Sequence, residues 1–362
     1  MSFPSTPDLP PPLSPPTAPA PDVAPPPAAP TPEETDRQTV ERLAGSRARI
    51  EAELGKVIVG QREVIEQILI ALLAGGHCLI TGAPGLAKTL LVKSIAQIFH
   101  LRFQRIQFTP DLMPADITGT EILQDHGSER RMVFVPGPIF ANMILADEIN
   151  RTPPKTQAAL LEAMQEHQVT ASGVRHPLQP PFFVLATQNP IEMEGTYPLP
   201  EAQLDRFMFN VVMDYLPEQD EVEVIQRTTG KPPAAIEPLF HGEDVQRFHA
   251  LVRQVPVAEE IVRYAVRLSA ASRPQGAQAP DFVKQWITWG AGTRAAQFLV
   301  LGAKARALVQ GRAHVTVEDI RALAAPALRH RILLNYRAEA ENAGVETIIR
   351  RLLETVPSPI PS

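Results

Sequence analysis

The chain has 362 residues, enough for one large domain or two ordinary ones, and we expect two from the usual domain size of about 100 to 200 residues. Its 44% hydrophobic and 20% charged residues exclude a wholly disordered chain. The formal net charge of −6 provides no general positive field for holding a polyanion. Nucleic acid is therefore not an expected partner.

Cysteine and apolar-run statistics exclude three further classes. The single cysteine, Cys78, cannot form an internal disulfide, and the nine histidines show no metal-ligand spacing. No apolar run approaches the roughly 18 residues of a membrane span, and the N-terminus lacks the order of a signal peptide. We expect a cytoplasmic protein without a membrane span.

The first 32 residues form a separate compositional segment. They contain 14 of the 38 prolines, and no Lys or Arg occurs before Arg37. Such a segment has little apolar surface to bury, so we predict an extended, disordered tail over 1–32. Its Pro-x-x-Pro pattern also fits an SH3-type ligand, but the adjacent cation of such ligands is missing, which favours a spacer. A second, short tail is expected at 357–362.

Residues 33–238 show the alternation of an α/β domain. Apolar positions at helical spacing run from Val40 to Leu54 and from Ile65 to Leu72. Strands are then expected at 77–81, 102–108, 141–146 and 182–187, and helices at 88–99 and 153–166. This order predicts a parallel sheet covered by helices, which binds ligands at the carboxyl ends of its strands.

Residues 239–356 are predicted to form a smaller, all-helical second domain. After Pro238 the strand pattern stops, and four segments each carry an apolar stripe at helical spacing. Thr316 and Asp319 give the last of them a cap-and-acid start. The four helices are expected at 244–255, 258–271, 293–309 and 317–328.

The segment Gly82–Thr89 has the context of a phosphate-binding loop, between a buried strand and an amphipathic helix. In such loops backbone amides surround the phosphates, so we expect Lys88 to reach the β- and γ-phosphates of ATP and the Thr89 hydroxyl to bind Mg²⁺. Ala87 stands where the usual motif has glycine, which requires either a negative φ or strain. The alternative is an ordinary Gly/Pro turn. The residues predicted to contact nucleotide are Gly82, Ala83, Pro84, Gly85, Leu86, Ala87, Lys88, Thr89 and Leu90.

Two adjacent acids follow the buried strand 143–146. At a strand's carboxyl end, Asp147 can hold Mg²⁺ through water while Glu148 orients and deprotonates the attacking water. The alternative is a helix-capping pair, because Asn150 and Thr152 also favour turns. The nearby phosphate-binding loop favours the catalytic interpretation.

Three further polar residues are ambiguous when considered alone. Asn189 follows another apolar strand and can hydrogen-bond a γ-phosphate or the lytic water, but Asn-Pro is also a common turn dipeptide. Arg206 and Arg294 would each, in isolation, be expected to form a surface salt bridge.

Six sequence motifs together resemble the MoxR family of AAA+ ATPases. The resemblance covers about residues 36–356, and alanine at the last small position of the phosphate-binding loop is typical of that family. The motifs are GAPGLAKT at 82–89, DLMPADITG at 111–119, FVPGPIF at 134–140, ADEINR at 146–151, LLEAMQE at 160–166 and PLPEAQLDRF at 198–207.

The resemblance implies a ring, usually a hexamer, with a nucleotide at each subunit interface. It makes Asn189 the first sensor, Arg294 the second sensor on the helical lid, and Arg206 an arginine finger that reaches the neighbouring subunit's γ-phosphate. Val59 and Gly60 resemble the segment that lines the adenine pocket, although a simple turn between two helices is the alternative.

Two insertions, at 121–135 and 167–181, resemble hairpins that grip DNA in helicase relatives. Here the second contains only Arg175 as a full cation, and the first mixes acids with Arg130 and Arg131. Neither forms a run of phosphate-neutralising charge, which favours protein clients.

The resemblance therefore implies a chaperone-like remodelling ATPase, with a von Willebrand factor A-domain protein as a possible partner. The alternatives are a DNA-coupled motor or a subunit of a metal chelatase. A nucleotide-locked scaffold that hardly turns over is disfavoured by the presence of both Glu148 and Arg206.

Overall fold

The computed structural model describes residues 45, 47–126, 129–171, 173–189, 195–230, 234–277 and 279–359. The predicted disordered tail at 1–32 lies outside the described residues, as do residues 33–44 and the last three residues of the expected C-terminal tail. The first helix is described up to residue 55.

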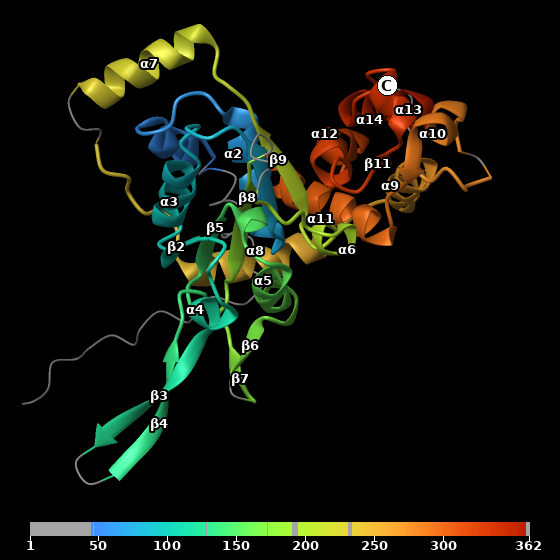
Figure 1. The fold of residues 1–362 in the computed structure, drawn as a ribbon. Coiled ribbons are helices and arrows are strands. Elements are labelled where there is room, and N and C mark those ends of the chain that lie inside the picture. Colours follow the sequence, from blue (N-terminus) through green and yellow to red (C-terminus); the bar gives the residue numbers. More distant parts are fainter. Residues whose placement is uncertain are drawn as a thin grey trace, which may run out of the picture.

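A five-stranded sheet forms the centre of the α/β region (Figure 1). All of its strand pairs are parallel, in the order β2-β5-β8-β1-β9. This confirms the predicted α/β fold with a parallel sheet. The strands are β1 (Cys78–Gly82), β2 (Phe103–Gln107), β5 (Met143–Asp147), β8 (Phe183–Gln188) and β9 (Phe209–Met213).

Alternating residues of the strands bury side chains on both faces of the sheet. Leu145 of β5 contributes to one hydrophobic cluster with helices α2 (Arg62–Ala74) and α3 (Lys88–Ile98). Its neighbour Ile144 contributes to a second cluster with helix α5 (Pro154–Glu166). Central strands with both faces covered read as continuous apolar runs, which is why β1, β5 and β8 were predictable. The edge strand β2 was also predicted, although Ile106 is its only buried residue.

The C-terminal region is a helical lid with one small sheet. The four predicted helices are present as α8 (Gly242–Gln254), α9 (Glu259–Ala271), α11 (Thr293–Val309) and α12 (Val317–Leu328). The structure adds α10 (Asp281–Trp286), α13 (Tyr336–Ala340) and α14 (Val345–Thr355). Strands β10 (Ile287–Trp289) and β11 (Leu333–Leu334) pair antiparallel, so the prediction of an all-helical lid is wrong in this detail. Strands of three and two residues are too short to show a period in the sequence.

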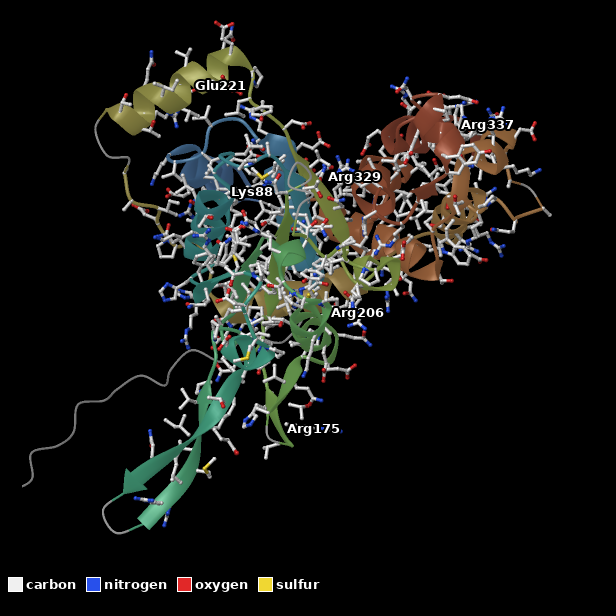
Figure 2. All side chains as sticks on the ribbon, viewed as in Figure 1. Lys88, Arg175, Arg206, Glu221, Arg329 and Arg337 are labelled. Atoms are coloured by element: carbon white, nitrogen blue, oxygen red, sulfur yellow. The ribbon has the colours of Figure 1, made fainter. Side chains whose placement is uncertain are left out.

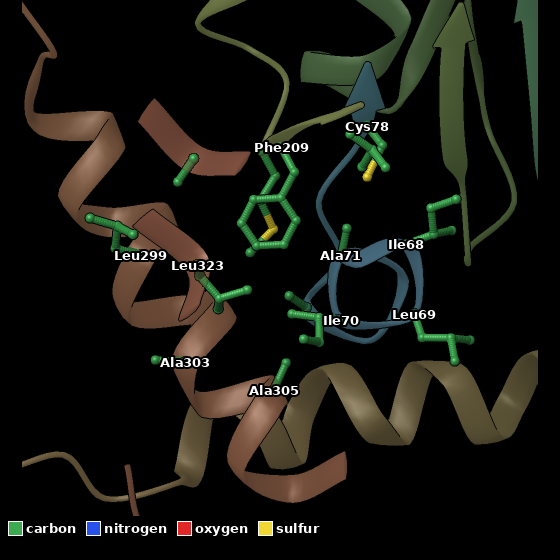
Figure 3. Close-up of a cluster of buried hydrophobic side chains, with 14 of the residues drawn as sticks. Ile68, Leu69, Ile70, Ala71, Cys78, Phe209, Leu299, Ala303, Ala305 and Leu323 are labelled. Carbon is green, nitrogen blue, oxygen red and sulfur yellow. The ribbon is translucent and has the colours of Figure 1, made fainter. Parts of the chain in front are cut away.

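The lid shares a core with the α/β region. In Figure 3, Ile70 of α2 and Phe209 of β9 lie beside Leu323 of α12 and Ala305 of α11. A Cβ at Gly302 would lie 2.9 Å from both Leu323 and Phe209, so glycine permits this close approach. The predicted division at residue 238 remains a prediction, because the core is continuous across it.

Two antiparallel hairpins project from the same end of the molecule (Figure 1). The first consists of β3 (Gly119–His126) and β4 (Glu129–Pro136), and the second of β6 (Gln168–Ala171) and β7 (Val174–Pro177). Both expected hairpin insertions are thus present. Short elements around them are α4 (Pro114–Thr118), η1 (Ile149–Arg151) and α6 (Glu201–Leu204).

Helix α7 (Glu218–Thr229) lies at the periphery of the molecule (Figure 1) and has no buried residue. Its Arg227 Nη1 donates to the carbonyl oxygen of Gly55. None of the helices in the described parts of the chain combines the length and the apolar character needed to cross a membrane.

Candidate functional site

The turn between β1 and α3 has the backbone of a phosphate-binding loop. Gly85 and Ala87 both have positive φ, +83° and +56°. A Cβ at Gly82 would lie 2.4 Å from the carbonyl oxygen of Met213, so only glycine fits there. The first amides of α3 have no partner within the helix and are available to an anion. Of the two expectations for Ala87, the negative φ is wrong and the strained conformation is observed.

Lys88 is the first residue of α3, and its ammonium group turns back onto the loop. Its Nζ donates a hydrogen bond to the carbonyl oxygen of Gly82. Burial lowers the pKa of Lys88, and the charges of Asp147 and Glu148 oppose this shift. The three charged groups predicted to act on nucleotide are therefore within electrostatic range of one another.

Asp147 and Glu148 are held at the end of β5 by Thr187 of the neighbouring strand β8. The Thr187 hydroxyl donates to Asp147 Oδ1 at 2.7 Å and accepts from the Glu148 amide at 2.8 Å. Arg105 Nε of β2 donates to Asp147 Oδ2 at 3.0 Å. The two carboxylates therefore have defined and different surroundings, although they are adjacent in the chain.

The Glu148 carboxylate accepts hydrogen bonds from Gln107 and Arg151, each at 2.9 Å. Its backbone is left-handed, with φ +58°, at the start of η1. The side chain makes no capping bond to that turn, which argues against the helix-capping alternative. Its side chain is 25% exposed and is therefore accessible to a water molecule from the site.

The available oxygen ligands fit Mg²⁺ bound together with a nucleotide. Thr89 on the first turn of α3 is half-buried, and Asp147 ends the second strand from β1. Within the described residues there is no group of three or more His, Cys, Asp or Glu side chains that could hold a metal ion. A Mg²⁺ ion here would take its other ligands from phosphate and water, as this ion usually does.

Asn189 directly follows β8, the strand between β1 and β5, and is buried. It therefore lies at the same edge of the sheet as the loop and the two acids. Val59 and Gly60 line a cavity of about 390 Å³ together with residues of α2 and α7, including Glu66. No residue of the phosphate-binding loop lines that cavity, so the cavity does not connect Val59 and Gly60 to the loop.

Arg206 lies near the amino ends of the sheet strands, whereas Lys88 lies at their carboxyl ends (Figure 2). It precedes β9, whose first residue, Phe209, pairs with Cys78 at the start of β1. Arg206 Nη1 donates to the carbonyl oxygen of Leu161 at 2.8 Å. The five residues of β1 span about 16 Å. Arg206 is therefore remote from the phosphate-binding loop of its own chain.

Arg294 lies beside Arg206 and not beside Lys88. Its Nη1 donates to Asp205 Oδ2 at 3.0 Å, and both arginines line a cavity of about 170 Å³. Arg331 Nε donates to the other oxygen of Asp205 at 2.7 Å. Burial lowers the pKa of Arg331 to about 10, despite the opposing effect of Asp205, and the group remains charged at neutral pH.

Sequence reasoning missed several of these residues. Thr187 ends the strand expected at 182–187, and Asp205 stands inside the motif at 198–207 next to Arg206, but neither was assigned a role. Arg105 and Gln107 lie on β2, and only the strand order brings them to β5. Nothing in the sequence marks Arg331, whose role depends on tertiary packing.

Comparison with known proteins places the two regions in described families. Residues 77–209 match the ATPase family associated with various cellular activities (AAA), and residues 282–352 match the AAA lid domain. The chain is 43% identical to chaperone MoxR1 of Mycobacterium tuberculosis, over 85% of this chain and 81% of that protein. It is 30% identical to protein MoxR of Methylorubrum extorquens, over 86% and 95%.

A solved structure from Cytophaga hutchinsonii has the same fold. It is 42% identical to this chain, with a TM-score of 0.83, and the likeness covers 90% of this chain and 98% of the other.

Proposed function

We propose, because this chain belongs to the MoxR family of AAA ATPases, that it binds ATP with Mg²⁺ and hydrolyses it in a ring of identical subunits. One observation carries the proposal. The carboxyl ends of the strands of one parallel sheet bring together the strained loop before α3, Lys88 and the Asp147–Thr187–Glu148 network. Ligands of open α/β sheets bind at this edge.

Each residue has a distinct role in this proposal. The amides of the loop and Lys88 bind the phosphates, while Thr89 and Asp147 hold Mg²⁺, which neutralises charge on the phosphates. Glu148 accepts a proton from the attacking water, and Asn189 orients that water or the γ-phosphate. Because Gln107 and Arg151 both donate to the Glu148 carboxylate, they set its direction.

Arg206 and Arg294 serve the nucleotide of a neighbouring subunit. They lie near the amino ends of the strands, whereas the phosphate-binding loop of the same chain lies at the carboxyl ends. They therefore cannot reach a nucleotide bound by that loop. A closed ring, expected to be a hexamer, would bring this edge of one subunit to the loop of the next. Val59 and Gly60 remain candidates for contact with the adenine.

The surface of the hairpins favours a protein client over nucleic acid. Apolar side chains are exposed on both hairpins. Exposed apolar patches on a protein surface usually mark contact with another protein or a membrane. We therefore propose chaperone-like remodelling of protein complexes, with a von Willebrand factor A-domain protein as a candidate partner. The exposed residues are Ile122, Leu123, Met132, Val135 and Val174.

Two substitutions test the ATPase proposal. Lys88→Ala removes a charged contact to the phosphates and should weaken ATP binding by about ten-fold or more. Glu148→Gln should keep ATP bound while turnover is lost, because Glu148 acts on water and does not grip the phosphates. Nucleotide titration and phosphate release measure the two effects.

Glu162→Gln on the exposed face of α5 is the matched control and should behave as the wild type. Unchanged affinity in Lys88→Ala, or wild-type turnover in Glu148→Gln, would contradict these roles.

A further inference from the structure

Asp205 joins the helical lid to the turn that carries Arg206. It ends helix α6 and directly precedes Arg206 in the chain. One of its carboxylate oxygens accepts from Arg294 at the start of α11, and the other accepts from Arg331 beyond α12. A single carboxylate is therefore shared by two arginines of the lid.

The two ion pairs of Asp205 differ in permanence. The Arg331 side chain is 2% exposed and donates further hydrogen bonds to four main-chain carbonyls, so it is fixed. The Arg294 side chain is 40% exposed, and its hydrogen bond to Asp205 is single, at 3.0 Å. An exposed pair with one hydrogen bond exchanges its partner at little cost, whereas a buried one does not.

Arg331 also holds the main chain on both sides of Arg206. It donates to the carbonyl oxygens of Asp205 at 2.9 Å and Phe207 at 2.7 Å. Its guanidinium lies 5.2 Å from the centre of the Phe298 ring on α11, the helix that carries Arg294. The turn before β9 and the start of α11 are thus connected through one buried side chain.

The cavity between Arg206 and Arg294 has the size and charge for a phosphate group. It measures about 170 Å³, and its lining includes the two arginines and His167. An anion that enters it competes with the Asp205 carboxylate for Arg294, because both are oxygen acceptors for the same guanidinium.

We propose that Asp205 is a positioning residue for ATP hydrolysis and the resting partner of Arg294. This inference rests on the proposed function, in which Arg206 and Arg294 face the nucleotide of a neighbouring subunit. With no phosphate in the cavity, Asp205 holds Arg294 beside Arg206 and offsets the repulsion between the two cations. When the neighbour's γ-phosphate enters, Arg294 exchanges the carboxylate for phosphate oxygens, while Arg331 keeps Asp205 and the turn in place. Asp205 itself touches no nucleotide.

The test is a double-mutant cycle in the full-length, assembled protein. Asp205→Asn keeps an acceptor for Arg331 but removes the charge that holds Arg294. We expect kcat to fall by about ten-fold, because Arg294 is no longer held beside Arg206 where the neighbour's γ-phosphate enters, with the Kd for ATP changed by less than about two-fold. Since Asp205 acts through Arg294, Asp205→Asn combined with Arg294→Gln should have a kcat within about two-fold of Arg294→Gln alone.

A matched control removes a lid ion pair that does not touch the turn. Glu346 accepts from Arg329 at 2.6 Å, and Glu346→Gln should retain the wild-type kcat. If Asp205→Asn does not fold, the same cycle is run with Asp205→Glu, which keeps the charge that Arg331 needs and moves the carboxylate by one methylene. A merely structural role would lower stability without the non-additivity with Arg294.

The possible failures are distinguishable. If the wild type hydrolyses ATP and Lys88→Ala binds it more weakly, but Asp205→Asn or its Glu replacement turns over normally, the role of Asp205 is refuted and the ATPase proposal stands. Fully multiplicative effects of the Asp205 and Arg294 substitutions also refute it. A wild-type protein that does not hydrolyse ATP refutes the proposed function and this inference together.

Discussion

Ala87 combines an L side chain with a left-handed backbone, at φ +56°, at the end of the phosphate-binding loop directly before α3. This conformation costs about 1 to 2 kcal/mol for a residue with a Cβ, while glycine adds about 0.5 to 1 kcal/mol of unfolded-state entropy. Ala87→Gly should therefore leave both stability and ATP affinity close to those of the wild type. Ala87→Val places a branched Cβ in the same conformation and should lower both. Thermal unfolding and nucleotide titration measure the difference, and a Val variant equal to the wild type would show that the loop does not need this backbone.

The residues of the site were predictable to different extents. Lys88, Asp147 and Asn189 each follow or begin an element that the sequence shows clearly, and parallel strands bring their carboxyl ends to one edge. The Asp205–Arg331 pair joins positions 126 residues apart. No local pattern predicts such a contact, because it depends on how the lid packs on the sheet.

At the scale of elements, α12 is anchored by a buried acid. The Asp319 side chain has no exposed surface and accepts from Arg306 and Arg312, each at 2.7 Å, and from the Thr316 amide at 2.8 Å. Asp319→Asn should destabilise the protein by about 3 kcal/mol, because it leaves two arginines without their shared counter-charge. Glu318→Gln, at an exposed neighbouring position, should have almost no effect.

The contribution of Asp319 should also depend on pH. Burial acts to raise its pKa, but the hydrogen bonds from Arg312, Thr316 and Arg306 prevail and lower the pKa below its usual value. A lowered folded-state pKa stabilises the protein above the unfolded-state pKa of about 3.9, and this contribution is lost as the pH falls through the folded-state pKa. The stability difference between wild type and Asp319→Asn should therefore shrink in acid. Denaturant unfolding at pH 7 and below pH 4 measures it, and a difference that is constant with pH would contradict the ionised state of Asp319.

The bounds of the longer helices were predicted from the sequence to within one or two residues. Helices α11 and α12 have the predicted bounds, and the Thr316–Asp319 capping box is present. Strand β9 was missed, although Asn210 is the only polar residue among its five. The lid strands β10 and β11 were missed because they exist only through their pairing, which joins Ile287 to Leu334 and Trp289 to Leu333.

In the proposed function, the whole molecule carries two halves of a catalytic site at opposite ends of the strands of one sheet. Lys88 and Glu148 lie at the carboxyl edge, and Arg206 and Arg294 lie at the other, tied to the lid through Asp205. The fold separates these groups within one chain, and in the proposed ring a neighbouring subunit would bring them together. In that proposed assembly the packing of the lid would set the direction of Arg206 and Arg294 toward the next subunit.

Mixed assemblies test this arrangement. Arg206→Ala should bind ATP normally but hydrolyse it about 10³-fold more slowly or worse, because every interface lacks the positive charge that stabilises the transition state. Lys88→Ala subunits fail at the other half of the site. Where a Lys88→Ala subunit supplies its intact Arg206 to ATP held by an Arg206→Ala subunit, both required groups are restored.

Mixing the two variants should therefore give a phosphate-release rate above that of either parent, provided that subunits exchange and a ring does not need every site active. Exchange is verified separately, by fluorescence transfer between labelled subunits. If exchange is shown and the mixture remains as inactive as its parents, action in trans loses its main support. Normal turnover by Arg206→Ala alone would contradict any role of Arg206 in hydrolysis, in trans or within its own chain.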